Sequence, residues 1–393
     1  MTLFADPSFF ILLVVAVVPA AALGLTGHAI RPWGLVVSLG FLALVFWGNP
    51  VQLAGLLGFL TLSRVALLWL ARDRKSNQRY AVAMASTLLP LVCYKLSQAA
   101  GGSLWGFVGI SYVTFKAAQM AIEVRDGLIT RDDLGLVDWL YFLLFFPQFS
   151  SGPIDRSRRF AADAHTVPTC DEYAGLLARG ILLLAAGMAY KFVLASLAER
   201  YWVLQPWGQG PALAELANQV RITYLYALYL FFDFAGYSLM AMGASYCLGI
   251  RCPRNFKAPF VALDIKDFWN RWHITLSTWF RDFVFMRFTR WAMRRHLIKG
   301  GRLRVAQCAF VVNMLVMGMW HGLTADYLCY GLYHGLLLAG TETLQKRWGF
   351  YKVHRNERWF KACEWFVTLQ LVMLGFAIFS GQMSFLLKGV FNG

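Results

Sequence analysis

Two histidines in this chain stand in segments where polar residues are surrounded by apolar and aromatic ones. His273 lies in FWNRWHITLSTWFRDF, residues 268–283, and His321 lies in GMWHG, residues 318–322. An imidazole has an ordinary pKa of about 6.5, so it can accept or donate a proton near neutral pH. Two imidazoles that reach one water-poor cavity would suit acyl transfer, because one can deprotonate an attacking hydroxyl while the other positions or protonates the second reacting group.

The first segment has the periodicity of an amphipathic helix. On a helix of 3.6 residues per turn over 266–283, one stripe collects Asn270, His273, Ser277 and Arg281, and the aromatic residues fall on the opposite side. One interpretation is an interfacial helix whose polar stripe faces water. The other is a helix inside the protein whose stripe lines a hydrophilic passage, and periodicity does not distinguish the two.

The second histidine lies in the run 305–325, which contains no Asp, Glu, Lys or Arg. A histidine near the end of a span can simply bond a neighbouring helix, but polar groups at membrane depth are costly and often functional. Gly318 and Gly322 are four residues apart, so we expect another backbone to approach this helix closely. We expect Trp320, together with Asn270 and Ser277 of the first segment, to support the site.

The rest of the chain must supply membrane-spanning elements that position these residues. Of its 393 residues 58% are hydrophobic and only 15% are charged, against about 25% charged in soluble domains. The apolar runs are continuous rather than alternating, which favours an all-α polytopic membrane protein over a barrel. We predict one domain over 1–393 with about eleven transmembrane helices, near residues 8–26, 33–48, 50–71, 79–97, 104–122, 135–151, 173–197, 219–249, 304–324, 326–343 and 361–387. The segment 150–160 is expected to form a short or re-entrant element.

The basic loops predict the orientation of the chain. The residues 72–75, of sequence RDRK, should be cytoplasmic by the positive-inside rule. Counting spans then places the N-terminus outside and the stretch 251–257 inside. The same rule accounts for most of the net charge of +16.

A dense basic run follows the first histidine segment. Residues 281–304 contain eight Lys or Arg and one Asp. Such a run can contact anionic lipid headgroups, or it can dock an acidic protein, and both can hold together. Nucleic acid is a poor alternative, because these residues flank membrane spans. The residues expected to form the dock are Arg287, Arg290, Trp291, Arg294, Arg295 and Leu297.

Isolated charges also occur inside apolar runs. Lys116, Lys191 and Asp233 are three of them, and an ion pair among them would lower the cost of burial. Asp233 could alternatively orient a histidine, as carboxylates do in catalytic triads. His334 is expected to be structural. The seven Cys are scattered and no phosphate-binding loop is present, so we predict no metal site and no bound nucleotide.

Several motifs in the sequence resemble those of a known family. The sequence FWNRWH at 268–273, followed 48 residues later by His321 in MWHG, is similar to the membrane-bound O-acyltransferase superfamily. GISYVTFK at 109–116 and FFDFAGYS at 231–238 are also similar to family motifs, although Ala235 replaces the usual Ser. FSSGPIDR at 149–156 resembles the version in the DltB-like D-alanyl transferases of the teichoic acid pathway.

The resemblance implies a fold and a reaction. It implies a ring of many helices around a thin core with a funnel or tunnel, with His321 as the catalytic base and His273 as the second polar position. The donor would be D-alanine on the phosphopantetheine arm of a small acidic carrier protein at the cytoplasmic face, so no cofactor would be bound directly. The acceptor would lead to teichoic acid outside.

The resemblance also implies further partners and a location. The partners are membrane lipid, a single-span enzyme and a very small membrane peptide of the same pathway. The location would be the cell membrane of a Gram-positive bacterium. Two alternatives stay open: a polysaccharide O-acetyltransferase of the same superfamily, and a proton-coupled secondary transporter, although transporters of that kind commonly contain internal repeats that we do not find here.

Overall fold

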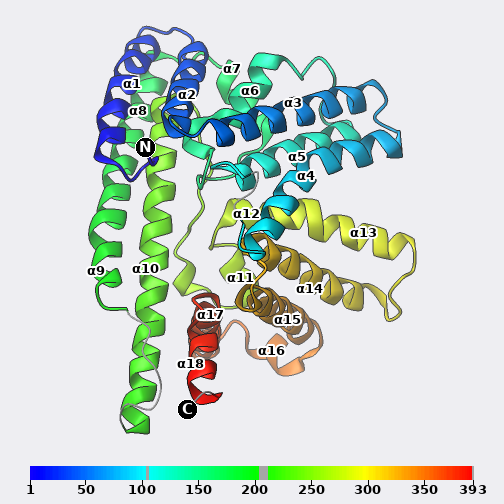
Figure 1. Ribbon diagram of the computed structural model, residues 1–393. Coiled ribbons are helices and arrows are strands. Elements are labelled where there is room, and N and C mark those ends of the chain that lie inside the picture. Colours follow the sequence, from blue (N-terminus) through cyan, green and yellow to red (C-terminus); the bar gives the residue numbers. More distant parts are fainter. Residues whose placement is uncertain (103–105, 203–210, 392–393) are drawn as a thin grey trace. The chain divides into compact units, whose positions relative to one another are not determined.

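Helices form the regular structure of the chain. The computed structural model describes residues 1–102, 106–202 and 211–391, and within these ranges every regular element is a helix, with no strand (Figure 1). The all-α prediction is therefore confirmed. Contacts divide the chain into two compact units: unit 1 is Met1–Ala189 with Gly236–Arg254, and unit 2 is Tyr190–Ala235 with Asn255–Gly393.

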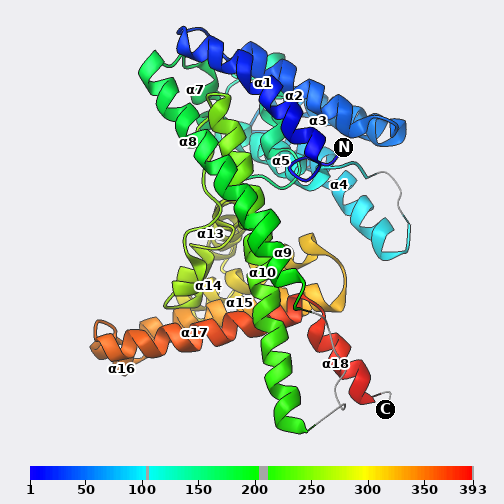
Figure 2. The ribbon, with the colours of Figure 1, turned by 90° about the vertical axis from the view of Figure 1, so that its left-hand side faces the viewer.

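Unit 1 is built around one helix that is buried on nearly all sides. This helix is α5 (Ile110–Asp126), which is flanked by Gly109 and Gly127. The two glycines have φ of 84° and 78°, in the left-handed region that glycine adopts without strain. The helices α3 and α4 pack against α5 and against each other, and α1 lies along α8 (Figures 1 and 2). The elements of unit 1 other than α5 and the end of α10 are α1 (Pro7–Leu25), α2 (Arg31–Phe46), α3 (Pro50–Arg72), α4 (Asn77–Ala99), α6 (Leu136–Leu144), η1 (Phe146–Gln148), α7 (Ser157–His165) and α8 (Cys170–Met188).

Unit 2 contains both histidine segments. A long helix, α10 (Ala212–Cys247), starts in unit 2 and continues into unit 1 at Gly236, and the π-helix η2 (Ala189–Ala195) continues from α8. The remaining elements of unit 2 are α9 (Ser196–Glu199), η3 (Pro259–Val261), α11 (Ile265–Trp269), α12 (Ile274–Phe280), the π-helix η4 (Arg281–Phe285), α13 (Met286–Arg294), α14 (Gly301–His321), α15 (Ala325–Arg347), α16 (Gly349–His354), α17 (Arg358–Phe379) and α18 (Gln382–Phe391).

A close helical hairpin carries His321. The helices α14 and α15 lie side by side along their length (Figure 1). A Cβ atom placed on Gly331 would lie 2.5 Å from the carbonyl oxygen of Met314, and one placed on Gly318 would lie 3.2 Å from the Cα of Gly331. The close approach predicted at Gly318 is therefore confirmed, and it is made by the backbone of α15.

Seven helices in the described residues are long and apolar enough to cross a membrane: α1, α3, α4, the continuous stretch Cys170–Glu199, α10, α14 and α17. These correspond to seven of the eleven predicted spans. The helix α2 is apolar but has only 16 residues, while α5 and α15 are helical without belonging to this set. The predicted span 104–122 also begins on residues outside the described ranges.

Two predicted spans have different boundaries in the structure. Residues 135–151 form only the nine-residue α6 and the short η1, because Pro147 and the loop after it end the helix. The predicted span 361–387 is wrong as a single helix: α17 ends at Phe379 and α18 begins at Gln382, with Gly381 between them at φ 79°. The segment 150–160 is a loop that leads into α7, in agreement with the short element predicted there.

Candidate active site

The segment 266–283 is not a continuous helix, so that prediction is wrong. The helix α11 ends at Trp269, a turn follows, and α12 begins at Ile274. His273 forms the junction with φ 44° and ψ 51°, a left-handed conformation that is uncommon outside glycine. Only a short amphipathic repeat remains on either side of the break.

The break is stabilised by Asn255, which lies far away along the chain. The N–H of Ile274 donates to the Asn255 carbonyl at 2.9 Å, and the N–H of Lys257 donates to the Arg271 carbonyl at 3.0 Å. The hydroxyl of Thr275 donates to Asn255 Oδ1 at 2.6 Å. The two backbone bonds pair the Ile274 N–H and the Arg271 carbonyl, groups that a continuous helix would have paired internally.

His273 lies in the interior of unit 2. It is 4% exposed, and the ring of Phe234 lies edge-on at 4.6 Å between centroids. Its Nε2 has no hydrogen-bond partner among the described residues. Burial and, secondarily, the proximity of His321 lower the pKa of His273 well below its ordinary value, so this imidazole is neutral at physiological pH.

His321 ends α14 and belongs to the same group of rings as His273. The rings of His273 and Trp320 are 6.5 Å apart, and those of Trp320 and His321 are 4.5 Å apart. Phe379 lies edge-on to His321 at 5.0 Å, and Tyr327 stacks on it at 5.9 Å. Two imidazoles thus lie near one indole, and His321 is half-buried, so a substrate can approach it.

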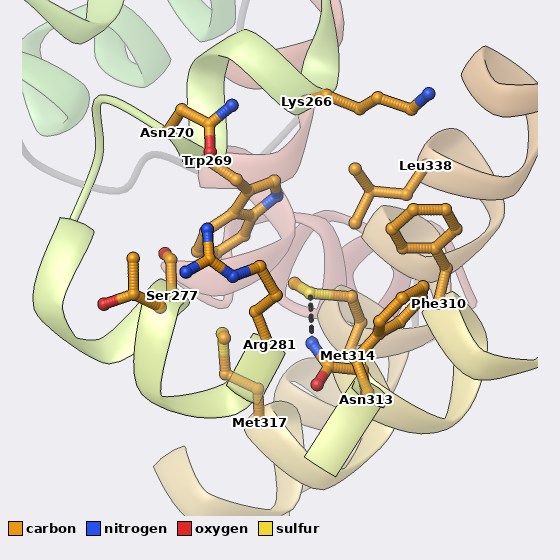
Figure 3. Close-up of a pocket in the computed structure, with 12 residues that line it drawn as sticks. Lys266, Trp269, Asn270, Ser277, Arg281, Phe310, Asn313, Met314, Met317 and Leu338 are labelled. Carbon is orange, nitrogen blue, oxygen red and sulfur yellow. Dashed lines mark hydrogen bonds between the residues drawn. The ribbon is translucent and has the colours of Figure 1, made fainter. Parts of the chain in front are cut away.

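A cavity of about 230 Å³ lies beside this group, between α11, α12 and α14. In Figure 3 the side chains of Trp269 and Arg281 point toward one another across it. Three residues of the predicted stripe line the cavity, whereas His273 is buried and does not line it. The lining consists of Lys266, Trp269, Asn270, Ser277, Thr278, Arg281, Phe285, Phe310, Asn313, Met314, Met317 and Leu338.

The cavity extends along α14 toward His321. Asn313, Met317 and His321 follow one another at intervals of four residues, so they share one face of the helix. Met317 lines the cavity, and His321 lies one turn beyond it.

Sequence reasoning missed Trp269 and Asn313 in this lining. A signal existed for Asn313, because it is a polar residue in the middle of the charge-free run 305–325. Trp269 gave no comparable signal, since tryptophans are frequent throughout the segment.

The charges that lie inside apolar runs have definite partners. Lys191 and Asp233 form an ion pair, as predicted for charges in apolar runs. The carboxylate of Asp233 is thus engaged with Lys191, and it is the next residue, Phe234, that contacts His273. Lys116 belongs to unit 1, where its Nζ donates to the Phe142 carbonyl at 2.9 Å.

The residues predicted to dock a partner lie on and just after α13. Trp291 and Leu297 are 51% and 50% exposed, although both are apolar. Arg290, Arg294 and Arg295 are also exposed, and Arg287 is partly buried. The helix packs on α14 through one side, with Ala292 buried. A mixed basic and apolar surface therefore stands beside the helix that carries His321.

The motif at 149–156 holds a polar network in unit 1. Ser150 and Tyr237 share a hydrogen bond of 2.7 Å, which joins this motif to the one at 231–238. The fully buried Asp155 accepts from Gln148 at 3.1 Å and from the Nε of Arg159 at 2.7 Å. These contacts give both motifs a structural role.

Comparison with known proteins identifies the family. The model of the membrane-bound O-acyltransferase family, MBOAT, matches residues 57–373. The chain belongs to this family. It is 39% identical to the teichoic acid D-alanyltransferase of Bacillus subtilis, over 97% of this chain and 98% of the relative. It is 37% identical to the teichoic acid D-alanyltransferase of Streptococcus thermophilus, over 97% of this chain and 95% of the relative. It is 31% identical to the probable alginate O-acetylase of Pseudomonas syringae, over 70% of this chain and 49% of the relative.

Family membership confirms the resemblance drawn from the motifs. The chain is an acyltransferase and a membrane protein, as the family and the long apolar helices together indicate. The transporter alternative is therefore set aside.

Proposed function

We propose that this chain transfers D-alanine from a phosphopantetheine thioester on a cytoplasmic carrier protein toward teichoic acid outside the membrane. The relatives named for teichoic acid D-alanyl transfer match almost the whole chain, whereas the alginate O-acetylase match spans about half of that relative. The observation that carries the proposal is the group formed by His273, Trp320 and His321 beside the cavity.

His321 acts as the general base in this mechanism. Its imidazole removes the proton from an acceptor hydroxyl while that oxygen attacks the thioester carbonyl carbon. The carbon–sulfur bond then breaks, the D-alanyl ester forms, and the pantetheine thiolate leaves. The proton held by His321 can return to that thiolate, which balances the reaction.

His273 positions the thioester rather than protonating it. Because its imidazole is neutral, it can donate one hydrogen bond without transferring a proton. The Nε2 atom without a protein partner is the group available for this bond. Aimed at the thioester carbonyl oxygen, it would stabilise the negative charge that develops there. Trp320, Asn270 and Ser277 shape the space around the thioester, and Asp233 supports the helix next to Phe234 through its ion pair.

The carrier protein docks on α13, where it would steer its arm into the cavity. The dock begins only a few residues after Arg281, which lines the cavity. An acidic carrier would be attracted by the exposed arginines 290, 294 and 295 and held by Trp291 and Leu297. The same surface can contact anionic lipid of a Gram-positive cell membrane. The single-span enzyme and the small membrane peptide remain expected partners in the steps that follow.

The direct test uses purified protein and a carrier loaded with labelled D-alanine. We expect label to leave the carrier only when the protein is present and to appear in an ester on a teichoic acid acceptor. Retention of the label on the carrier, with transfer from an acetyl donor instead, would contradict the proposal.

A polysaccharide O-acetyltransferase is the second candidate. It is favoured by the 31% identity to alginate O-acetylases over 70% of the chain. The same pair of labelled donors separates it from D-alanyl transfer.

A further inference from the structure

Two residues that line the cavity each carry a buried polar atom without a partner among the described residues. Asn313 and Trp269 are 7% and 8% exposed, and both line the cavity. Asn313 Oδ1 and Trp269 Nε1 have no hydrogen-bond partner among the described residues. Buried polar groups are normally paired, because leaving one unpaired is costly, so two in one cavity indicate a ligand that pairs with them.

The two atoms have complementary character. The indole Nε1 can only donate, whereas the amide Oδ1 of Asn313 can only accept. The Asn313 Nδ2 group contacts Met314 Sδ at 3.9 Å, which leaves Oδ1 as its free polar atom. One donor and one acceptor match a ligand amide, which presents a carbonyl and an N–H. The apolar lining from Phe310, Met314, Met317 and Leu338 suits the methylene groups on either side of such an amide.

We infer that Asn313 and Trp269 bind an amide of the donor's pantetheine arm, with Asn313 accepting from its N–H and Trp269 donating to its carbonyl. This assignment rests on the proposed function. The side chains are positioning residues, since they act on the arm and not on the reacting atoms. The acyl chain of a lipid fits less well, because it would leave both polar atoms unpaired.

The register along α14 selects one of the arm's two amides. Asn313 lies eight residues before His321, which is about 12 Å along the helix axis. In an extended arm the amide farther from the thioester lies roughly 10 Å from the thioester carbon, and the nearer amide roughly half as far. With the thioester at His321, the distal amide reaches Asn313.

The test compares two small donors in the parent and in Asn313→Leu. D-alanyl-S-pantetheine carries both amides, and D-alanyl-S-N-acetylcysteamine carries only the proximal one. The parent should prefer the longer donor by about a hundredfold in kcat/KM, because the distal amide makes two buried hydrogen bonds worth about tenfold each. Asn313→Leu should reduce this preference to about tenfold, because the bond from Trp269 remains, and it should lower kcat/KM more for the longer donor than for the shorter one. Trp269→Phe, which removes only the N–H group, should reduce the preference in the same way.

Two measurements separate this role from a structural one. Gln307→Leu lies on the same helix, where Gln307 Nε2 donates to Thr343 Oγ1 at 2.6 Å outside the cavity lining, and it should leave the donor preference unchanged. Asn313→Leu removes an unpaired buried group, so its melting temperature should equal or exceed the parent's. A clear fall in melting temperature, with the donor preference intact, would overturn the assignment.

The outcomes also distinguish this inference from the proposed function. If the parent transfers D-alanine and Asn313→Leu keeps the full donor preference, the amide assignment is wrong and the function stands. If the parent uses no D-alanyl donor, the proposed D-alanyl transfer is wrong. Binding of labelled pantetheine then tests the amide assignment on its own. Binding that is weakened both by Asn313→Leu and by an ester in place of the distal amide would support it, and equal binding in all cases would overturn it.

Discussion

The proposed chemistry depends on the different states of two residues, His273 and His321. His273 is buried, neutral and held in a left-handed turn, whereas His321 is half-buried at the end of a helix. The sequence indicates both residue types and their aromatic surroundings. It does not indicate the turn, because the bonds that stabilise it come from Asn255, 18 residues before His273.

The neutrality of His273 leads to a pH prediction. A histidine whose pKa is lowered becomes charged only at more acidic pH, so it does not titrate near the ordinary value of about 6.5. His273→Gln should therefore lower kcat by about a hundredfold, as loss of an oxyanion donor does, without moving the acid limb of the pH–rate profile. Rates measured from mildly acidic to mildly alkaline pH test this. A displaced acid limb in the variant would show that His273 titrates in the reaction.

At the element scale, the hairpin of α14 and α15 fixes the position of His321. The glycine spacing at 318 and 322 indicates a close partner, but the sequence alone does not identify α15 as that partner. Gly331 and Gly335 of α15 complete the contact. The apolar pattern of that helix does not distinguish these two positions from the others. Sequence periodicity does not predict which distant segments come into contact, so this part of the site could not be predicted from it.

The hairpin contact predicts unequal effects of two similar substitutions. Gly331→Ala places a methyl group 2.5 Å from a backbone oxygen of α14, which has little freedom to move. We expect a loss of about 1–3 kcal/mol in stability and a lower melting temperature in detergent. The control is Gly340→Ala on the same helix, where nothing lies within 4 Å of the added atom and stability should be kept. Equal melting temperatures for both variants would contradict the close packing.

The surface of α13 predicts a salt-dependent interaction. Changing Arg294 and Arg295 together to Glu should weaken carrier binding, and the loss should be larger at low salt than at high salt, since salt screens exposed charges. The matched control reverses two exposed charges, Lys352 on α16 and Arg355 just after it, and should bind the carrier normally. Binding by the parent that does not change with salt, or an equal loss in both variants, would count against this dock.

At the scale of the whole molecule, composition is sufficient to predict an all-α membrane protein but not its exact spans. Apolar runs such as 33–48 and 135–151 read as spans, yet one forms a 16-residue helix and the other only short helices with a loop. Helix breaks at Pro147 and Gly381 depend on local turns that average hydropathy does not resolve.

The orientation predicted by the basic loops can be measured on the whole chain. In a background without the native cysteines, Asn49→Cys should react with an impermeant thiol reagent in intact cells. Ser76→Cys, next to the basic residues 72–75, should react only after the membrane is opened. The pair tests whether α3 crosses the membrane, because identical labelling of both sites would show that the expected alternation of sides fails.

Transfer by His321→Ala is the most direct test of the general base. Loss of a general base predicts a fall in D-alanine transfer of about a hundredfold to ten-thousandfold, with carrier binding kept. His354→Ala, which removes a histidine on α16 paired with Glu357, should transfer at the parent's rate. Near-parental transfer by His321→Ala would contradict the assignment of the base.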